Sequence, residues 1–192
     1  MIGIVTAMRL RWSVLNQLLQ EKAMTPEQLP ASVKFFETGD NQTHYLYLID
    51  SSLMPDISEA LLGGISITTF GGSWHVGSVS AHEGYGPLMY RLAMEWVAEN
   101  GRGRGLTRNP GETSDAAKRV WQKFDDVRRD PSSGIKAVNA DDPMRPEYVA
   151  RTGELKRMRT RWLNLTPQQS NEAWMMLTDL AIGGQRGYDE AS

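Results

Sequence analysis

Residues 76–90 read VGSVSAHEGYGPLMY and combine a β-forming run, a glycine turn and the start of a helical pattern. The first part of this stretch, residues 76–81, has the composition of a β-strand, and the Gly-Tyr-Gly at 84–86 marks a tight turn. From residue 87 to residue 100 the apolar side chains recur with the period of a helix, and Gly101 is placed to end it. The stretch therefore predicts a strand that runs through a glycine turn directly into a helix.

Such a junction suits an anionic ligand. Glycines let the backbone turn tightly and approach a ligand closely, and the first turn of a helix presents unpaired N–H groups and the positive end of the helix dipole. A pyrophosphate is the ligand that fits such a junction best. A Gly-x-Gly between a strand and a helix is also often only a tight turn, so the rest of the chain has to decide between the two interpretations.

On the N-terminal side, a first helix is predicted over residues 10–22, and a second, short one begins after the cap-like sequence Thr25-Pro26-Glu27-Gln28. Three runs rich in β-forming residues follow, and Asp, Pro and Gly clusters separate them; they cover residues 43–50, 61–69 and 74–81. Their connections are short, which favours antiparallel neighbours, because a parallel crossover needs a dozen or more residues.

On the C-terminal side, a strand and another helix are predicted, and Thr113 or Ser114 can cap that helix. Its apolar face comprises Ala117, Val120, Trp121 and Phe124. From residue 131 the chain is rich in helix and strand breakers, which predicts a surface connector. Two helices follow, a strongly basic one over residues 146–162 and one that opens with the capping box at 166–169. The tryptophans on the helical stripes are typical of a core or an interface; they are Trp96, Trp121, Trp162 and Trp174.

The composition restricts the possible functions. The 192 residues hold 21 Lys and Arg against 23 Asp and Glu, so the net charge of −2 gives no overall field toward nucleic acid or an anionic membrane. Cysteine is absent, which excludes disulfides, thiolate catalysis and Cys-based metal sites. The three histidines do not stand at ligand spacing, so no metal is expected. No apolar run is long enough for a signal peptide or a membrane-spanning helix, so a soluble protein without membrane contact is expected.

Residues 74–124 resemble the acyl-CoA-binding core of the GNAT acetyltransferase superfamily. In that family a strand leads into the pattern Gln/Arg-x-x-Gly-x-Gly/Ala, whose amides hold the coenzyme A pyrophosphate, and residues 81–86 (AHEGYG) are similar to it at both glycines. A later helix of the form Asn-x-x-Ala-x-x-x-Tyr carries a tyrosine that commonly serves as general acid, and residues 114–121 (SDAAKRVW) match it at Ala117.

The resemblance implies an α/β fold in the mixed α+β sense. A largely antiparallel, twisted central sheet of GNAT type would be flanked by helices, and the third predicted strand and the helix after it would form a splayed junction at its centre. Residues 1–130 would make up the GNAT-like domain, and residues 131–192 the connector and a C-terminal helical pair.

The same resemblance implies acetyl-CoA as a ligand and assigns its contacts. The cofactor-binding residues would be Gly84, Tyr85, Gly86, Leu88, Ser114, Ala117 and Trp121. The chain departs from the family pattern at Ala81, where Gln or Arg is usual, and at Pro87, which removes one amide. Trp121 stands at the position of the acid, and an indole N–H cannot hand over a proton at neutral pH.

Other groups must therefore supply the acid and the base if the chain is an enzyme. Glu83 and His82 are the candidate bases, because they immediately precede the glycine turn, and Tyr85 is the candidate acid. Each also has a plainer interpretation, as a solvent-facing residue at a strand end or as a ring that stacks over the helix start.

The segments EGYGPLMY, SDAAKRVW and FDDVRRD also resemble a group of tailed-bacteriophage proteins that are described as GNAT-like. This resemblance implies a phage gene product located in the virion or the host cytoplasm. Two functions are then open: an N-acyltransferase-type protein that moves an acyl group to an amine, or a non-catalytic structural or adaptor protein of the virion that retains the fold. A host-takeover binding protein cannot be separated from the second.

Two further surfaces are candidate contact sites. The C-terminal helices would contact other virion or host proteins, and the basic segment 151–161 would meet an acidic surface or DNA phosphates. Arg102, Arg104 and Arg108 could reach the phosphates of a nucleotide, although a solvent-exposed loop is the plainer interpretation.

Overall fold

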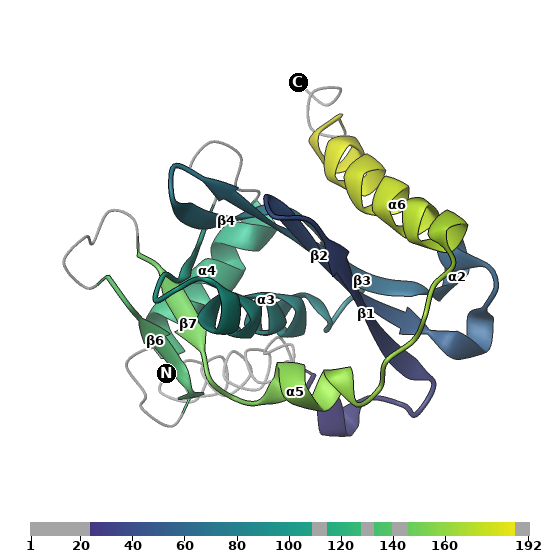
Figure 1. Cartoon of the computed structure of the whole chain (residues 1–192), viewed down its shortest axis with the longest axis horizontal. Coiled ribbons are helices and arrows are strands. Elements are labelled where there is room, and N and C mark those ends of the chain that lie inside the picture. Colours follow the sequence, from purple (N-terminus) through teal and green to yellow (C-terminus); the bar gives the residue numbers. More distant parts are fainter. Residues whose placement is uncertain (1–23, 109–114, 128–132, 140–145, 187–192) are drawn as a thin grey trace, which may run out of the picture.

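The structure of the chain is a computed structural model, which describes residues 24–108, 115–127, 133–139 and 146–186 (Figure 1). The helix predicted over residues 10–22 and the predicted cap residues Thr113 and Ser114 lie outside the described residues. Within them, the predicted mixed α+β class with a mostly antiparallel sheet is confirmed.

The first half of the described chain is dominated by strands. They are β1 (Val33–Gly39), β2 (Thr43–Asp50), β3 (Leu61–Phe70) and β4 (Ser73–Ala81), with the helical turns η1 (Pro26–Gln28), η2 (Ser51–Leu53) and α2 (Ile57–Ala60). The three strands predicted from the sequence are confirmed as β2, β3 and β4, and β1 adds an edge strand that was not predicted. Antiparallel pairing throughout this meander is also confirmed.

The second half alternates helices with short strands. Its elements are α3 (Gly86–Asn100), β5 (Leu106–Thr107), α4 (Asp115–Val127), β6 (Ile135–Ala137), β7 (Tyr148–Ala150), α5 (Glu154–Arg159) and α6 (Pro167–Arg186). Gly101 ends α3 as predicted, and its N–H bonds the carbonyl of Val97 at 2.6 Å. The capping box that opens α6 is formed between Thr166 and Gln169.

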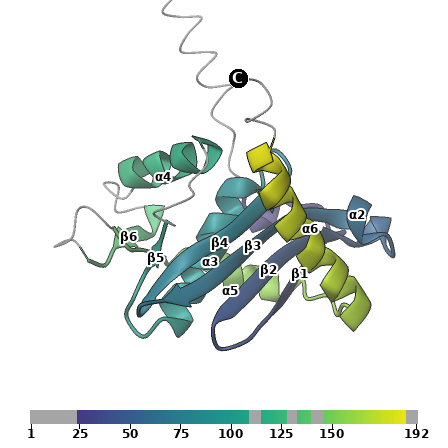
Figure 2. The same ribbon diagram turned by 90° about the horizontal axis from the view of Figure 1, so that it is seen from above.

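Seven described strands form one sheet in the order β1-β2-β3-β4-β5-β7-β6. Only β4 and β5 run parallel, and α3 is the crossover between them. Figure 2 shows α3 and α5 on one face of the sheet, and α4 and α6 on the other.

The sheet buries side chains on both faces because its central strands are apolar in both registers. On β2, Leu46 and Leu48 point into the larger core with α3, while Tyr47 and Ile49 point into a smaller core with α6. All four are fully buried. Burial of each aliphatic side chain is worth about 1.5–3 kcal/mol, so the alternation holds helices against both faces.

Two predictions for the region after residue 130 differ from the structure. The expected surface connector contains β6, which pairs with β7 and extends the sheet across position 131. The helix expected over residues 146–162 is reduced to α5, because β7 occupies its first part and Gly153 takes a left-handed conformation with φ of 74°. Glycine adopts the left-handed conformation at little cost, whereas other residues are strained there, so the chain can turn at Gly153 from β7 into α5.

Candidate functional site

The predicted junction between a strand and a helix exists at the end of β4. The chain leaves β4 at Ala81, turns at Gly84 with φ of 86°, and enters α3 at Gly86. The N–H of Tyr85 closes the turn on the carbonyl of His82 at 3.1 Å. A tight glycine turn is therefore confirmed at the place where the sequence predicted it.

Two backbone donors are left at the start of α3. The N–H of Met89 bonds the carbonyl of Tyr85 at 3.0 Å, but those of Gly86 and Leu88 bond no group of the described chain. Pro87 between them has no N–H. A Cβ added at Gly86 would meet no atom of the described residues within 4 Å. Leu88 is fully buried, so the junction offers a ligand the N–H of Gly86 and the positive end of a 15-residue helix.

The position of this junction in the sheet is the one where open α/β sheets bind ligands. From β4 the chain crosses to α3 on one face, while from the parallel neighbour β5 it continues to α4 on the opposite face (Figure 2). Divergence of two adjacent parallel strands to opposite faces opens a crevice outside their carboxyl ends. β5 pairs with β4 only at Trp74 and His75, so the later part of β4 has no described strand beside it on that edge.

β4 is also bent at this point by a β-bulge. Its pairing with β3 shifts between Ile65 and Ile67, and the N–H of Ser78 donates to the hydroxyl of Ser66 at 2.7 Å instead of to a strand partner. A Cβ at Gly77 would lie 2.6 Å from that hydroxyl, so the bulge requires glycine there. Bulges commonly re-aim a strand next to a functional site.

The three predicted catalytic residues flank the turn. His82 and Glu83 are exposed, and their side chains make no bond within the described chain. Tyr85 is half-buried; burial raises the pKa of its phenol, and the negative charge of Asp50 raises it further. Tyr85 is therefore protonated at neutral pH and can act as a hydrogen-bond donor.

Trp121 lies deep in an aromatic cluster. Its ring is 3 % exposed and packs at 5.3 Å from the ring of Tyr90 on α3 and at 5.6 Å from that of Tyr148 on β7. Phe124 completes the cluster. The contact with Tyr90 places the helix that bears Trp121 beside the first turns of α3. Of the other assigned residues, Leu88 is fully buried and Ala117 is half-buried.

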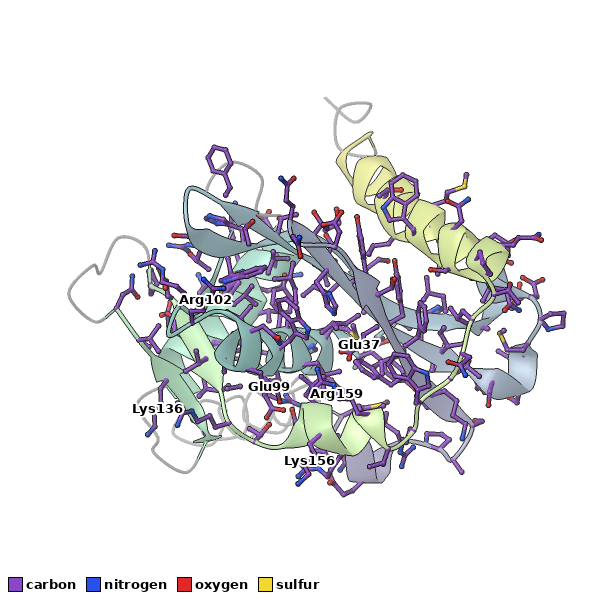
Figure 3. All side chains as sticks on the ribbon, viewed as in Figure 1. Glu37, Glu99, Arg102, Lys136, Lys156 and Arg159 are labelled. Atoms are coloured by element: carbon purple, nitrogen blue, oxygen red, sulfur yellow. The ribbon has the colours of Figure 1, made fainter. Side chains whose placement is uncertain are left out.

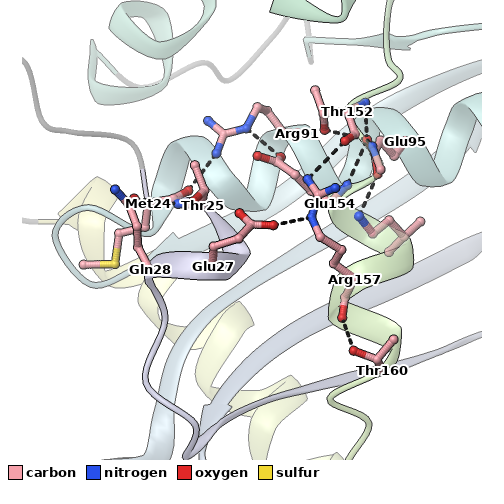
Figure 4. A network of polar contacts seen from close by, with 12 residues as sticks. Met24, Thr25, Glu27, Gln28, Arg91, Glu95, Thr152, Glu154, Arg157 and Thr160 are labelled. Atoms are coloured by element: carbon pink, nitrogen blue, oxygen red, sulfur yellow. Dashed lines mark hydrogen bonds and ion pairs between the residues drawn. The ribbon is translucent and has the colours of Figure 1, made fainter.

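A buried carboxylate on α3 was not predicted from the sequence. Glu95 of α3 is 5 % exposed, and its oxygens accept hydrogen bonds from the N–H groups of Thr152, Gly153, Glu154 and Leu155 and from the hydroxyl of Thr152 (Figure 4). The distances lie between 2.5 and 3.3 Å. Glu95 thus caps α5 from another helix, and only the apolar stripe around it hinted that this face is buried.

Two ion pairs continue the same network. Arg91, one helical turn before Glu95, donates to Glu154 at 2.7 Å and to the carbonyl of Met24 at 2.7 Å (Figure 4). Arg157 pairs with Glu27 at 2.6 Å. The network joins α3, α5 and the segment around η1.

Most of the basic side chains in the segment 151–161 form ion pairs or hydrogen bonds within the chain. Arg159 lies between Glu37, at 3.2 Å, and Glu99, at 2.7 Å (Figure 3). Arg161 donates to the carbonyls of Leu29 and Pro30. In the described part of the chain this leaves the side chains of Arg151 and Lys156 exposed and unpaired.

Of the three arginines that follow α3, one is paired within the chain and two are exposed. Arg104 pairs with the buried Glu147 at 3.1 Å and donates to Ser73 at 2.8 Å. Arg102 and Arg108 are exposed.

Among the described residues there is no group of three or more His, Cys, Asp and Glu side chains placed to hold a metal ion. None of the helices within the described ranges is long and apolar enough to cross a membrane.

No known family model matches the chain, and no curated protein or solved structure is significantly similar to it. Its function must therefore be inferred from its own geometry.

Proposed function

We propose that the chain is a GNAT-like protein that binds an acyl coenzyme A, with acetyl-CoA as the first candidate, at the junction between β4 and α3. One observation carries the proposal: a glycine turn at the divergence of β4 and β5 presents the free, partly exposed N–H of Gly86 at the start of a long helix. Helix N-termini bind phosphate groups through such donors and through the helix dipole.

The surroundings of the junction fit this ligand. The space beside Gly86 is open, which a pyrophosphate needs in order to reach the backbone. The edge of β4 after His75 lacks a described strand partner, and a pantetheine arm, which carries two amides, can hydrogen-bond to such an edge. Only the N–H of Gly86 is accessible to the phosphates, because Pro87 has no N–H and Leu88 is buried, so we expect weaker binding than a complete set of amides would give.

Catalysis would depend on groups at the same turn. Bound acetyl-CoA would supply a thioester that an acceptor amine attacks. Glu83, exposed beside the turn, or a water molecule would take the proton from the amine, and the phenol of Tyr85 would donate to the leaving sulfur. Trp121 has no proton to give, and its ring is buried in the aromatic cluster.

That last observation favours a second candidate function. In a virion structural or adaptor protein of phage origin, the fold would be retained and the reaction lost. A buried indole that joins α3, α4 and β7 stabilises the fold at the position where an acid would otherwise act.

Calorimetry with acetyl-CoA tests the binding site. We expect Gly86→Glu to abolish binding, because a carboxylate at the start of the helix repels phosphate. The matched variant Gly86→Gln adds similar bulk without the charge and separates the two effects. Neither variant should disturb the fold, since the added side chain meets open space. Failure of the wild-type protein to bind acetyl-CoA at about 1 mM, or equal binding by Gly86→Glu, would eliminate the site.

Release of free thiol from acetyl-CoA in the presence of a panel of amines tests the enzyme. Activity that falls in Glu83→Gln and in Tyr85→Phe would support acyl transfer, whereas binding without turnover would leave the adaptor function. Detection of the protein in purified phage particles would then be the decisive measurement, and its absence from them would exclude a virion role.

A further inference from the structure

A separate pocket lies between the first turns of α6 and the end of the β1–β2 hairpin. Figure 2 shows α6 on the face of the sheet opposite to α3. The volume of the pocket is about 370 Å³, and Thr38, Tyr45, Tyr47, Ser170, Asn171 and Trp174 line it. A cavity of this size is at the lower end of the range of small-molecule sites. It shares no residue with the junction at Gly86.

The lining is uncharged but rich in hydrogen-bonding groups. Of the described residues that line the pocket, none is Asp, Glu, Lys, Arg or His. Hydroxyls from Thr38, Tyr45 and Ser170, and the amide of Asn171, can each donate and accept. A charged ligand would find no counter-charge here, whereas a neutral ligand with several hydroxyls would find partners for them.

Trp174 provides a flat apolar wall that is already held in place. Its indole N–H donates to the hydroxyl of Tyr45 at 3.1 Å, yet the residue is 41 % exposed. The rings of Tyr45 and Tyr47 stack beside it in nearly parallel planes, 8° apart. A partly exposed ring that is fixed through its polar edge can be covered by a flat ligand at little cost in side-chain entropy.

Tyr47 lies behind the other lining residues of the pocket. The residue is fully buried, and its hydroxyl has no hydrogen-bond partner in the described chain. Because this oxygen is inaccessible, the hydrogen bonds to a ligand come from the other lining side chains.

We propose that this pocket binds a neutral saccharide, with one sugar ring stacked on Trp174 and its hydroxyls bonded to Thr38, Ser170 and Asn171. A sugar ring combines a flat apolar face with hydroxyls that both donate and accept, which is the combination the lining presents. A proline-rich peptide brings mostly carbonyl acceptors and would leave the pocket's acceptors unpaired. A nucleotide would carry phosphates into an uncharged site.

Titration with glucose, N-acetylglucosamine and cellobiose, followed by saturation-transfer NMR and calorimetry, tests the site. A ligand with so few atoms should bind with a Kd on the order of 1 mM. Trp174→Ala should weaken binding about tenfold or more, because it removes the stacking wall. Trp162→Ala is the matched control: Trp162 is 43 % exposed, its indole N–H bonds Asn164, and it does not line the pocket.

A saccharide that binds to the wild-type protein and to Trp162→Ala, and is lost in Trp174→Ala at unchanged thermal stability, supports the proposal. Three results would each overturn it: no saturable binding of any of the three sugars, equal binding by Trp174→Ala, or displacement of the sugars by a hexaproline peptide or adenosine with higher affinity. Acetyl-CoA binding should be the same in all of these variants, so the pocket and the β4–α3 junction are tested independently.

Discussion

The replacement of Glu95 by glutamine tests the energetic role of the buried cap on α5. One oxygen of Glu95 accepts from Thr152, Gly153 and Glu154, and the other accepts from Leu155 at 2.6 Å. Glutamine can keep the first oxygen as a neutral carbonyl, but its NH₂ group must then face the N–H of Leu155. One bond is lost, two donors are opposed, and the remaining bonds lose the strength that the charge gave them.

A hydrogen bond to a charged group contributes about 1.5–3 kcal/mol, and an opposed buried donor costs about 1–3 kcal/mol. Because glutamine still satisfies part of the donor set, we expect Glu95→Gln to lower the free energy of unfolding by about 2–3 kcal/mol. In a chain of 192 residues this corresponds to a fall in Tm of about 5–10 °C. Urea unfolding followed by tryptophan fluorescence measures it, and Trp96 is the neighbouring reporter.

Glu99→Gln is the matched control one turn later on α3. The Glu99 carboxylate is exposed and makes one ion pair, with Arg159, so its loss should cost less than about 1 kcal/mol. A cost below about 0.5 kcal/mol for Glu95→Gln, or equal costs for the two variants, would show that the cap contributes no more than a surface contact.

Three further predictions concern the turn, the acid range and the aromatic cluster. Gly84→Ala should destabilise the fold by about 1–2 kcal/mol, because its φ is 86°, whereas Gly86→Ala two residues later should stabilise it by about 0.4–1 kcal/mol; urea midpoints of both variants measure this. Burial alone would raise the pKa of Glu37, but His44 and Arg159 bring it below its usual value. The contribution of Glu37 to stability is therefore complete above about pH 4.5 and is lost as the pH falls through the lowered pKa. Arg159→Gln should lose less stability than the wild-type protein between about pH 5 and pH 3, and an unchanged pH profile would contradict this. Trp121→Ala should cost about 3–5 kcal/mol, whereas Phe70→Ala, at a residue that is 81 % exposed, should change stability by less than about 0.5 kcal/mol; thermal unfolding of the pair measures the difference.

The parts of the fold that local patterns determine were predictable from the sequence. The strands β2, β3 and β4, the turn at Gly84 and the helices α3 and α6 each have a distinct period and their own capping or turn residues. These signals act within a few residues of one another, so they are visible without any knowledge of the tertiary structure.

The missed features depend on partners that are distant in the chain. β6 and β7 have three residues each, too few to show a period, and only their pairing with each other and with β5 makes them strands. The role of Glu95 is likewise invisible locally, because its donors lie 57 to 60 residues later. The pairing of Arg159 with Glu37 spans 122 residues and removes a cation that the sequence alone offered to an outside partner.

For the candidate site, the sequence predicted the strand, the turn and the helix, but not the environment of Trp121. That tryptophan was assigned both to an apolar stripe and to a ligand contact. Its packing against Tyr90 and Tyr148 confirms the first assignment, and contact with a ligand stays a prediction.

The brevity of β5 has a mechanical consequence. It pairs with β4 at two positions and with β7 at one. The backbone hydrogen bonds that join the long meander to the β6–β7 ribbon are therefore few. Beyond this pairing, the ribbon lies against the rest of the fold mainly where β7 packs on α3. Under heat or tension the ribbon should therefore detach as a unit while the meander persists, and native-state hydrogen exchange would record its amides opening at a lower free energy.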